Sequence, residues 1–501
     1  MRKRPLALMA ACSLSASLLG CAVDGAADSE NDLSPAQDPT EMSTDLVGVH
    51  VAASSTSSDP DAEGTDGVDL DDPQRPWGPN ADAANRVLET EDLEAYAAEM
   101  GIKLGDGPDM TTKALCNGDD NLTFVNDFTG KHGISSRFVQ REKIPVGIIR
   151  PIGCSGTLIA HDLFLTNAHC VPEDGAQVLA QTVQFGFEED GELLESLPSQ
   201  SFPVVNLLEL RNQNLDYAIY RLGHLPGLIY GHNTVASGDP PSGSVISIIG
   251  HPAFRRKQVD VGHARYNVFL DRILYDDLDT LGGNSGSGIL NAQGELTGLH
   301  YGGSCDGWFG YNYGEKMSNL LQASPLLRNT PRQLILSQGT DPTLYVIHGG
   351  ARLAIASMDE FNALGFRAQD HRVLPPGALS STPTVPRDGT VLVTPGGARH
   401  VVFGGARFPI HLLMEFTALG YSNPDMNPAP QLATQAIPLI PRDGTLLQER
   451  SHDPVYVVLG GIRYWIQNWT VFHARGYQKN RIRIIPDGSV AQIPFGGVLT
   501  S

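Results

Sequence analysis

The sequence predicts an all-β fold made of short antiparallel strands. Glycine and proline supply 54 and 34 of the 501 residues, and so many turn-forming residues favour short strands over helical bundles. Residues 116–327 contain apolar runs of three to five residues bounded by Gly, Pro or Asn, which is typical of an antiparallel sandwich or barrel. The runs are Val146–Ile149, Thr157–Ile159, Phe164–Thr166, Ala218–Leu222, Val245–Ile249, Gly288–Leu290 and Leu296–His300.

Length and charge exclude several classes of protein. A chain of 501 residues is expected to hold about three domains of roughly 150 residues each. Lys and Arg number 35 against 56 Asp and Glu, a net charge of −21, and this acidic balance argues against a nucleic-acid partner. The sequence also has no apolar stretch of the roughly 18–20 residues that a spanning helix needs, so a polytopic membrane protein is excluded.

Residues 1–21 are expected to be a signal peptide. The basic residues Arg2 to Arg4 precede an apolar segment, Leu6 to Leu19, that is too short to span a membrane. The residues up to Cys21 read Leu-Leu-Gly-Cys and resemble the lipobox of bacterial lipoproteins, which implies a lipid anchor on Cys21 in the cell envelope. The alternative is ordinary cleavage nearby and a secreted product. Cys12 is a weaker lipidation candidate, because little apolar sequence precedes it.

Residues 22–79 are predicted to form a disordered, acidic linker. Ala22 to Gln74 contains 14 Asp and Glu and no Lys or Arg, so this segment buries little and repels itself. Residues 80–114 are expected to be a prosegment or further linker. Within them, Thr90–Met100 has the pattern of one short helix, with Thr90 as its N-cap and Gly101 just beyond its end.

The other four cysteines, Cys116, Cys154, Cys170 and Cys305, agree with export. An even number of widely spaced cysteines in an exported chain predicts two disulfides, for which three pairings are open. Zinc binding is the rival interpretation, but the sequence has no Cys-x-x-Cys pair, so we expect neither a metal nor a cofactor.

Three motifs in residues 116–327 carry the residue types of nucleophilic catalysis. His169 follows Leu-Thr-Asn-Ala, Asp216 precedes Tyr-Ala-Ile, and Ser285 lies in Gly-Gly-Asn-Ser-Gly. A serine hydroxyl becomes a good nucleophile when an imidazole takes its proton, and a buried carboxylate fixes the tautomer of that imidazole. The glycines before Ser285 allow the N–H groups of Gly283 and Ser285 to converge as an oxyanion hole.

In this order, the motifs resemble those of the trypsin-like (chymotrypsin-fold) serine peptidases. The resemblance implies a double six-stranded antiparallel barrel over residues 115–330, with His169 as general base, Asp216 as its orienting partner and Ser285 as nucleophile. It also implies a Cys154–Cys170 disulfide beside the base, which leaves Cys116–Cys305 as the second. The expected activity is hydrolysis of peptide bonds in a protein or peptide substrate.

The specificity pocket is expected to involve Thr280 and His300. Asn284 precedes the serine where trypsin has Asp, and this feature resembles bacterial and viral branches of the fold, including glutamyl endopeptidases. Those enzymes also have Thr five residues before the serine and His fifteen after it, as here, which implies cleavage after Glu or Asp. Asp279 stands where trypsin selects Arg or Lys, so cleavage after basic residues and other specificities stay open.

Residues 337–501 contain three repeats of about 55 residues. Gly-Gly-x-Arg recurs at Gly349, Gly404 and Gly460, and each copy has Phe 12 residues after its first Gly and another Gly after 16. Each unit is predicted to be a β-hairpin and a short helix, and the three are predicted to stack as one module. The motif resembles repeats of bacterial surface proteins. A structural pedestal and a binder of cell wall or glycan are both open, and Tyr464, Trp465 and Trp469 would suit sugar stacking.

Two functions of different classes follow. The first is a secreted or lipid-anchored serine endopeptidase whose only membrane contact is the anchor. The second is a non-catalytic surface protein in which the repeats bind wall or glycan and the peptidase fold is a scaffold. The presence of His169, Asp216 and Ser285 together favours the enzyme, since a scaffold needs none of them.

Overall fold

The structure of the protein is a computed structural model that describes residues 115–116, 120–189, 197–267, 270–305, 310–339 and 341–500. The predicted signal peptide, Cys21, the acidic linker and the Thr90–Met100 helix lie outside these residues. Within them, no helix is both long enough and apolar enough to cross a membrane.

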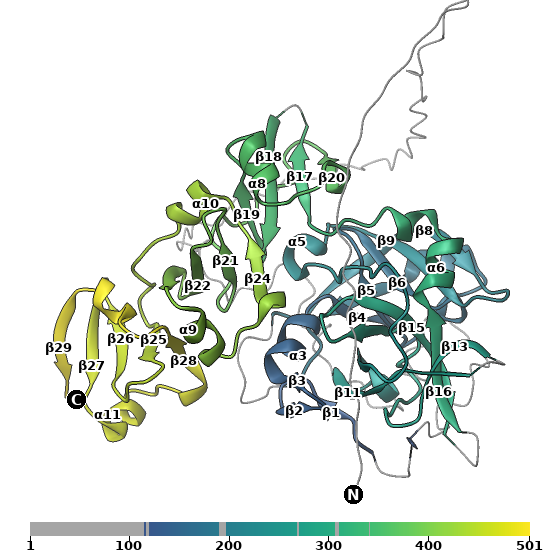
Figure 1. Ribbon diagram of the computed structural model, residues 1–501, viewed down its shortest axis with the longest axis horizontal. Coiled ribbons are helices and arrows are strands. Elements are labelled where there is room, and N and C mark those ends of the chain that lie inside the picture. The colour runs from purple at the N-terminus through teal and green to yellow at the C-terminus, as the bar shows by residue number, and fades with distance from the viewer. Residues whose placement is uncertain are drawn as a thin grey trace, which may run out of the picture. The chain divides into compact units, whose positions relative to one another are not determined.

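A closed barrel of six antiparallel strands forms the first part of the fold (Figure 1). Its strands neighbour one another in the order β4-β5-β6-β9-β8-β7. Aromatic and β-branched side chains such as Phe164, Val183, Phe185 and Tyr220 fill its interior without exposure to solvent. The strands are β4 (Val146–Arg150), β5 (Ser155–Leu158), β6 (Leu163–Thr166), β7 (Thr182–Phe185), β8 (Gln200–Arg211) and β9 (Tyr217–Leu222).

An eight-stranded antiparallel sheet forms the second part, in place of the second six-stranded barrel that was expected. Its order is β1-β11-β10-β14-β15-β16-β13-β12. The difference arises at the edges, where β1 adds to β11 and the β12–β13 hairpin extends the other side. The strands are β1 (Thr123–Phe124), β10 (Val245–Gly250), β11 (Gln258–His263), β12 (Arg265–Asn267), β13 (Leu270–Tyr275), β14 (Gly288–Asn291), β15 (Leu296–Ser304) and β16 (Tyr311–Lys316).

One hydrophobic core joins the barrel to this sheet. Ile159 and Leu165 of the barrel and Val259 and Leu299 of the sheet belong to the same fully buried cluster, which helix α6 (Met317–Ala323) also enters. Such packing holds the facing loops of the two parts in fixed positions. The smaller elements are β2 (Gly130–Lys131), β3 (Ile134–Ser135), α3 (Ser136–Glu142), α4 (Gly175–Ala180), α5 (Gly227–Tyr230) and α7 (Pro325–Arg328).

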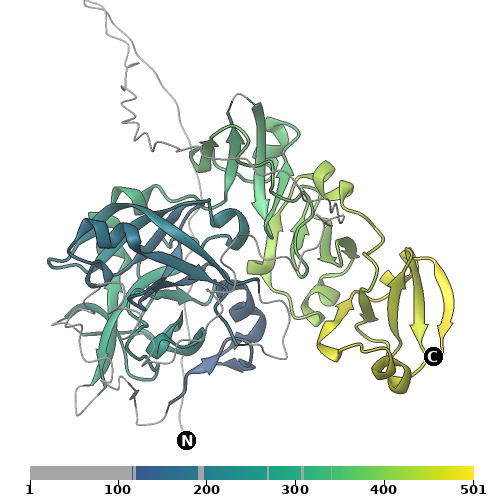
Figure 2. The ribbon, with the colours of Figure 1, turned by 180° about the vertical axis from the view of Figure 1, so that it is seen from behind.

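Three further sheets share one topology, seen from both sides in Figures 1 and 2 in green to yellow. In each, a hairpin of antiparallel strands is followed by a short helix and by a strand that pairs in parallel with the first strand. The first has β17 (Ile335–Gln338), β18 (Asp341–His348), β19 (Ala351–Ala354), α8 (Met358–Ala363) and β20 (His371–Leu374). The second has β21 (Val391–Val393), β22 (Arg399–Phe403), β23 (Ala406–Ile410), α9 (Leu413–Ala418) and β24 (Met426–Pro428), followed by α10 (Gln431–Ala436). The third has β25 (Leu446–Glu449), β26 (Val455–Leu459), β27 (Ile462–Ile466), α11 (Trp469–Ala474) and β28 (Ile482–Ile485), and adds β29 (Phe495–Leu499).

The Gly-Gly-x-Arg motif has a structural cause. Both glycines of each hairpin turn have positive φ, as at Gly460 (61°) and Gly461 (73°), a conformation that residues with a Cβ rarely adopt. The arginine donates to backbone carbonyls of the segment that follows its repeat, as Arg463 does to Val490 and Ile493. Consecutive repeats also share hydrophobic cores: one cluster joins the first and second repeats, and another joins the second and third. Each repeat therefore buries apolar side chains that the neighbouring repeat could not bury alone.

Candidate active site

Asp216 and His169 form the best-defined polar pair of the site. Oδ2 of Asp216 lies 2.5 Å from Nδ1 of His169, and its Oδ1 accepts the His169 backbone N–H at 3.0 Å. Asp216 is buried directly before β9, whereas the His169 imidazole is about one-third exposed. The carboxylate therefore holds both the backbone and the ring of His169, leaving Nε2 as the ring nitrogen that can exchange a proton.

Asn167 strengthens this arrangement, although sequence analysis gave it no role. Its side-chain Nδ2 donates to the backbone oxygen of Asp216 at 2.7 Å, and the residue is fully buried. It thus joins the loop that carries the base to the loop that carries the carboxylate. Its position two residues before His169 was the available signal.

The loop of Ser285 lies against the His169 loop. The Ser285 carbonyl accepts from Ser155 N at 2.9 Å, and Gly286 N donates to the His300 carbonyl at 3.0 Å. A Cβ on Gly286 would come within 2.3 Å of Thr166 Oγ1 and 3.0 Å of Asn167 N, so only glycine permits this approach. The described contacts include no hydrogen bond between Ser285 and His169, and such bonds often tighten only when substrate is bound.

The backbone next to Ser285 is arranged as an oxyanion hole requires. Ala253 N donates to the Gly282 carbonyl, so the N–H of Gly283 on the same trans peptide points the opposite way. Gly283 has φ +96°, and a Cβ there would lie 2.4 Å from the His251 carbonyl. Within the described residues, neither Gly283 N–H nor Ser285 N–H donates to another backbone group, which leaves both free for a developing oxyanion.

Tyr301, Arg272 and Glu315 form a chain of contacts next to the His169–Asp216 pair. Tyr301 packs edge-on against His169 with ring centroids 5.8 Å apart, and the Arg272 guanidinium lies 4.6 Å from the Tyr301 centroid. Arg272 also pairs with buried Glu315 at 2.5 Å, and the Asp216 backbone N–H donates to the Glu315 carboxylate. Burial raises the pKa of Glu315, whereas Arg272 opposes that rise.

The sequence did not predict a role for Tyr301, Arg272 or Glu315. Arg272 and Glu315 lie outside the three sequence motifs. Tyr301 alone had a local signal, its position directly after His300.

His300 is buried close enough to His169 to feel its charge, and it bonds to Tyr275. Burial lowers the pKa of His300 to about 3, and His169 contributes to the same effect, so the ring is neutral near pH 7. Its Nδ1 hydrogen-bonds the phenolic oxygen of Tyr275, a fully buried side chain whose pKa burial raises well above its ordinary value. Thr280 is also buried.

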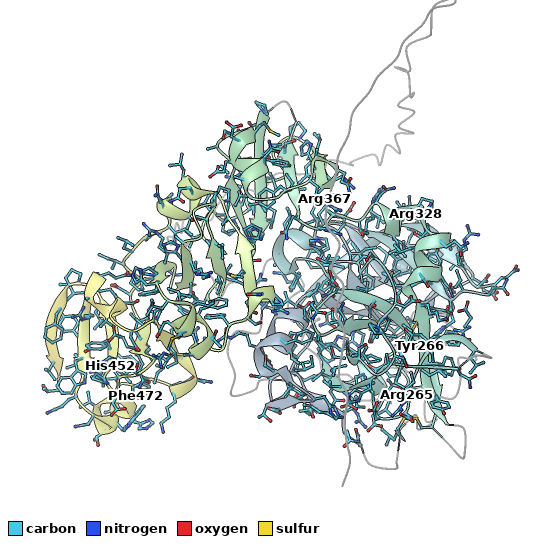
Figure 3. All side chains as sticks on the ribbon, viewed as in Figure 1. Arg265, Tyr266, Arg328, Arg367, His452 and Phe472 are labelled. Atoms are coloured by element: carbon cyan, nitrogen blue, oxygen red, sulfur yellow. A yellow bond between two sulfur atoms is a disulfide. The ribbon has the colours of Figure 1, made fainter. Side chains whose placement is uncertain are left out.

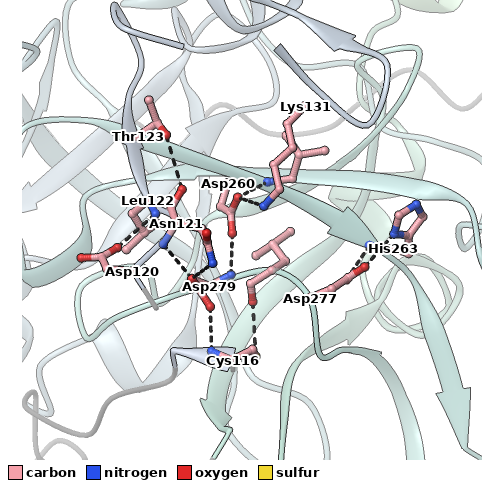
Figure 4. Close-up of polar contacts among 12 residues, drawn as sticks. Cys116, Asp120, Asn121, Leu122, Thr123, Lys131, Asp260, His263, Asp277 and Asp279 are labelled. Atoms are coloured by element: carbon pink, nitrogen blue, oxygen red, sulfur yellow. Dashed lines mark hydrogen bonds and ion pairs between the residues drawn. The ribbon is translucent and has the colours of Figure 1, made fainter. Parts of the chain in front are cut away.

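Asp279 has partners other than His300 (Figure 4). Its carboxylate accepts from Cys116 N at 2.7 Å and from Asn121 N and Nδ2 at 2.9 and 2.8 Å. Its own N–H donates to Asp260 Oδ2, and Lys131 pairs with the other oxygen of Asp260. The Asp279 carboxylate is therefore engaged by Cys116 and Asn121.

The structure contains the disulfides Cys154–Cys170 and Cys116–Cys305, in agreement with the pairing that the resemblance implies. The first fixes the His169 helical turn, residues 168–170, to Cys154, the residue directly before β5. The second joins the Asp279-bound segment to the strand that carries His300.

Among the residues that the structure describes, two clusters contain metal-ligating residue types. In the first, Cys154, His169 and Cys170, both sulfurs are in the disulfide, so neither is a thiolate. The second, His132, His263 and Asp277, lies at the surface, and there His263 Nδ1 bonds to Asp277 Oδ2 at 2.7 Å. The chemistry of the His169 site requires neither.

The closed β-barrel, the carboxylate-held imidazole of His169 and the adjacent Ser285 loop are features of a trypsin-like fold. Residues 154–299 match the family model described as trypsin-like peptidase domain. Among solved structures, the chain resembles the Rv3671c protease in its inactive form, at 19% identity, covering 37% of this chain and 92% of that one, with a TM-score of 0.29. It also resembles a Glu endopeptidase in complex with MPD, at 22% identity, covering 42% of this chain and 100% of that one, with a TM-score of 0.32. No curated protein matches the sequence.

Proposed function

We propose that the protein is an exported serine endopeptidase that cleaves peptide bonds through an acyl-enzyme on Ser285. The observation that carries the proposal is the His169–Asp216 hydrogen bond, beside a serine loop whose Gly283 and Ser285 N–H groups are free. His169 Nε2 takes the Ser285 proton as Oγ attacks the scissile carbonyl, and the two N–H groups stabilise the oxyanion. The imidazolium then protonates the leaving amine, and water hydrolyses the ester by the reverse sequence.

Cleavage after Glu or Asp is the specificity that we propose. A neutral His300 whose Nδ1 is bonded to Tyr275 has its Nε2–H left to donate to a carboxylate, and the buried Thr280, five residues before Ser285, supplies a hydroxyl. The partners of Asp279 disfavour cleavage after Arg or Lys, because its carboxylate already accepts three hydrogen bonds from Cys116 and Asn121.

Export and anchoring through Cys21 complete the proposal. Two disulfides support an oxidising compartment, where such bonds persist. A labelled fatty acid should be incorporated into the full-length protein in its host and lost in Cys21→Ala. Equal incorporation in both would contradict the anchor while leaving the peptidase proposal intact.

A fluorophosphonate probe tests the catalytic proposal against the scaffold alternative. We expect the purified protein to be labelled and to hydrolyse peptides, and Ser285→Ala to lose both, with a fall in kcat on the order of 10⁴-fold or more. Ser287→Ala is the matched control, because Ser287 is a buried serine in the same loop whose hydroxyl has no partner among the described residues. An unlabelled, correctly folded protein would favour a non-catalytic scaffold.

A further inference from the structure

The third repeat has a hollow that two tryptophans flank. It encloses about 320 Å³ at the end of β27 and the start of α11. Its lining includes the buried apolar residues Val455, Ile466 and Phe472 and the exposed indoles of Trp465 and Trp469. Phe472 marks this part of the molecule in Figure 3. A volume of this size is at the lower end of the range for small-molecule sites.

Both indoles are exposed, and neighbouring side chains hold that of Trp469 in place. Trp465 is 36% exposed and Trp469 49% exposed, although indoles ordinarily bury most of their large apolar surface. Phe472 packs edge-on against Trp469 at 5.0 Å between centroids, and the Lys479 ammonium lies 4.7 Å from its centroid. Trp469 therefore presents a fixed aromatic surface that loses little conformational entropy on binding.

Polar groups at the rim are available to a ligand. Within the described part of the chain, the side chains of Gln467 and Asp453 have no hydrogen-bond partner, although both line the hollow. Asn468 uses Oδ1 to cap α11 through Val471 N at 3.0 Å, which leaves its Nδ2 as a donor. The Gln467 amide, the Asn468 Nδ2 and the Asp453 carboxylate thus lie beside the apolar lining of the hollow.

The fold of the repeats does not require these tryptophans. Counted from the Gly-Gly pair, Trp465 corresponds to Ala354 and Pro409, and Trp469 corresponds to Met358 and Leu413. Met358 and Leu413 are more than half exposed and begin equivalent helices, so this position faces solvent in all three repeats. Phe472, by contrast, has buried Phe equivalents in both other repeats and is part of the common core.

Of the three aromatic residues that the sequence suggested for sugar stacking, Tyr464 has a different role. It packs, half-buried, against the core of the third repeat, and its ring would clash with a Cβ at Gly496.

We propose that the hollow of the third repeat binds a glycan through stacking on Trp465 and Trp469. The C–H face of a pyranose ring is apolar and flat enough to pack on an indole, while its hydroxyls can bond to Gln467, Asn468 and Asp453 at the rim. A quaternary ammonium also prefers aromatic surroundings, but the Lys479 ammonium already lies over Trp469 and repels a second cation. This site would hold the peptidase on a polysaccharide surface and is independent of its catalytic activity.

Sedimentation of the full-length protein with two insoluble probes, peptidoglycan sacculi and cellulose, tests the proposal. We expect binding to at least one, and a loss of affinity of about tenfold or more in Trp465→Ala/Trp469→Ala. Which probe binds distinguishes a wall glycan from a plain glucan. Met358→Ala/Leu413→Ala is the matched control, because it truncates the exposed positions equivalent to Trp469 in the other two repeats and should bind as the parent does.

Fluorescence provides a second readout, since two of the four tryptophans of the chain line the hollow. Soluble fragments of the bound glycan should shift the emission of the parent and of the control, but not of the double variant. Circular dichroism and fluorophosphonate labelling check that the variants fold. The proposal is overturned if neither probe binds, if the double variant binds as tightly as the parent, or if choline chloride competes and glycan fragments do not.

Discussion

Tyr275 holds its phenolic oxygen against Nδ1 of His300, and burial keeps both side chains neutral. A phenol whose pKa is raised well above 10 retains its proton, and an imidazole whose pKa is lowered to about 3 has one free acceptor nitrogen. The simplest assignment has the Tyr275 O–H donating to Nδ1, which fixes the proton of His300 on Nε2. This tautomer suits a hydrogen bond to a substrate carboxylate.

Tyr275→Phe should therefore weaken recognition of an acidic side chain. Without the phenol, Nδ1 can carry the proton, and Nε2–H is no longer the obligatory donor. A hydrogen bond to a charged group contributes about 1.5–3 kcal/mol, so kcat/KM for a Glu substrate should fall about 10- to 150-fold. Kinetics with matched Glu and Gln peptides measure the effect, and the Gln substrate should be less affected.

Tyr266→Phe is the control for that substitution. It removes a phenolic hydroxyl from β12 of the same sheet, where Tyr266 bonds to the Pro240 carbonyl. Its Glu-to-Gln preference should equal that of the parent. If the Glu-to-Gln preference of Tyr275→Phe also equals that of the parent, Tyr275 does not determine specificity. That result would leave the proposed catalysis by Ser285 untouched.

The Arg272–Glu315 pair is predicted to position Asp216, the proposed partner of the general base. Arg272→Gln leaves the Glu315 carboxylate buried without its cation and removes the guanidinium from Tyr301. Since Glu315 holds the Asp216 backbone N–H, the His169–Asp216 pair should shift, lowering kcat by about 10- to 100-fold with a small change in KM. Arg272→Lys should restore little, because an ammonium lacks the planar stacking surface.

Arg265→Gln provides the comparison for Arg272. Arg265 belongs to the neighbouring strand β12 and pairs with Asp276 at 2.5 Å, but both side chains are well exposed. Exposed pairs contribute little, so kcat should be unchanged. A purely structural role for Arg272 would appear as lower thermal stability with kcat per folded molecule and its pH profile unaltered.

Asp279 is predicted to act in stability and not in selection of substrate. Asp279→Ala removes the acceptor of three N–H donors of Cys116 and Asn121, and the unfolding free energy should fall by about 2 kcal/mol or more. Denaturant unfolding measures the loss, and Glu, Lys and Arg peptides measure specificity. Unchanged ratios among those peptides are expected, whereas a selective effect on Lys and Arg peptides would return Asp279 to the specificity pocket.

The residues of the candidate triad were easier to predict from the sequence than the residues that hold them in position. His169, Asp216 and Ser285 lie in short motifs whose residue types and order carry information, and Gly283 needs glycine for a local reason, its φ of +96°. Arg272, Tyr275 and Glu315 reach the site only through strand pairing across the sheet, for which no local signal exists. Asp279 shows the converse: its position suggested a specificity role, but its orientation depends on the segment around Cys116.

The fold was predictable to a similar depth. Apolar runs bounded by turn residues correctly indicated antiparallel strands, because burial and turn chemistry act locally. The eight-stranded sheet was not predicted, since whether a sheet closes or gains edge strands depends on pairing between distant segments such as β1 and β11. In the repeats, the turns need positive φ at two successive residues. They therefore require the Gly-Gly pairs from which the hairpins were predicted.

Acid is predicted to destabilise the fold through buried neutral histidines. Burial lowers the pKa values of His232 and His348 to about 4 and that of His300 to about 3, against 6.5 when unfolded. As the pH falls, the histidines of the unfolded chain therefore become protonated before those of the folded protein. The stability that each neutral imidazole contributes is complete above pH 6.5 and is lost as the pH falls toward its folded value. Glu142 and Glu315 act in the opposite direction, because burial raises their pKa values.

His348→Gln isolates one imidazole from this balance. His348 Nε2 bonds to the Pro428 carbonyl at 2.8 Å, and the glutamine amide can donate there without titrating. Between pH 6.5 and 4.5 the parent should lose up to about 1.4 kcal/mol more per pH unit than the variant. Urea unfolding at pH 7.0, 6.0, 5.0 and 4.5 measures both slopes. Equal slopes would show that His348 keeps an ordinary pKa in the folded protein, and that burial against Pro428 does not exclude its charged form.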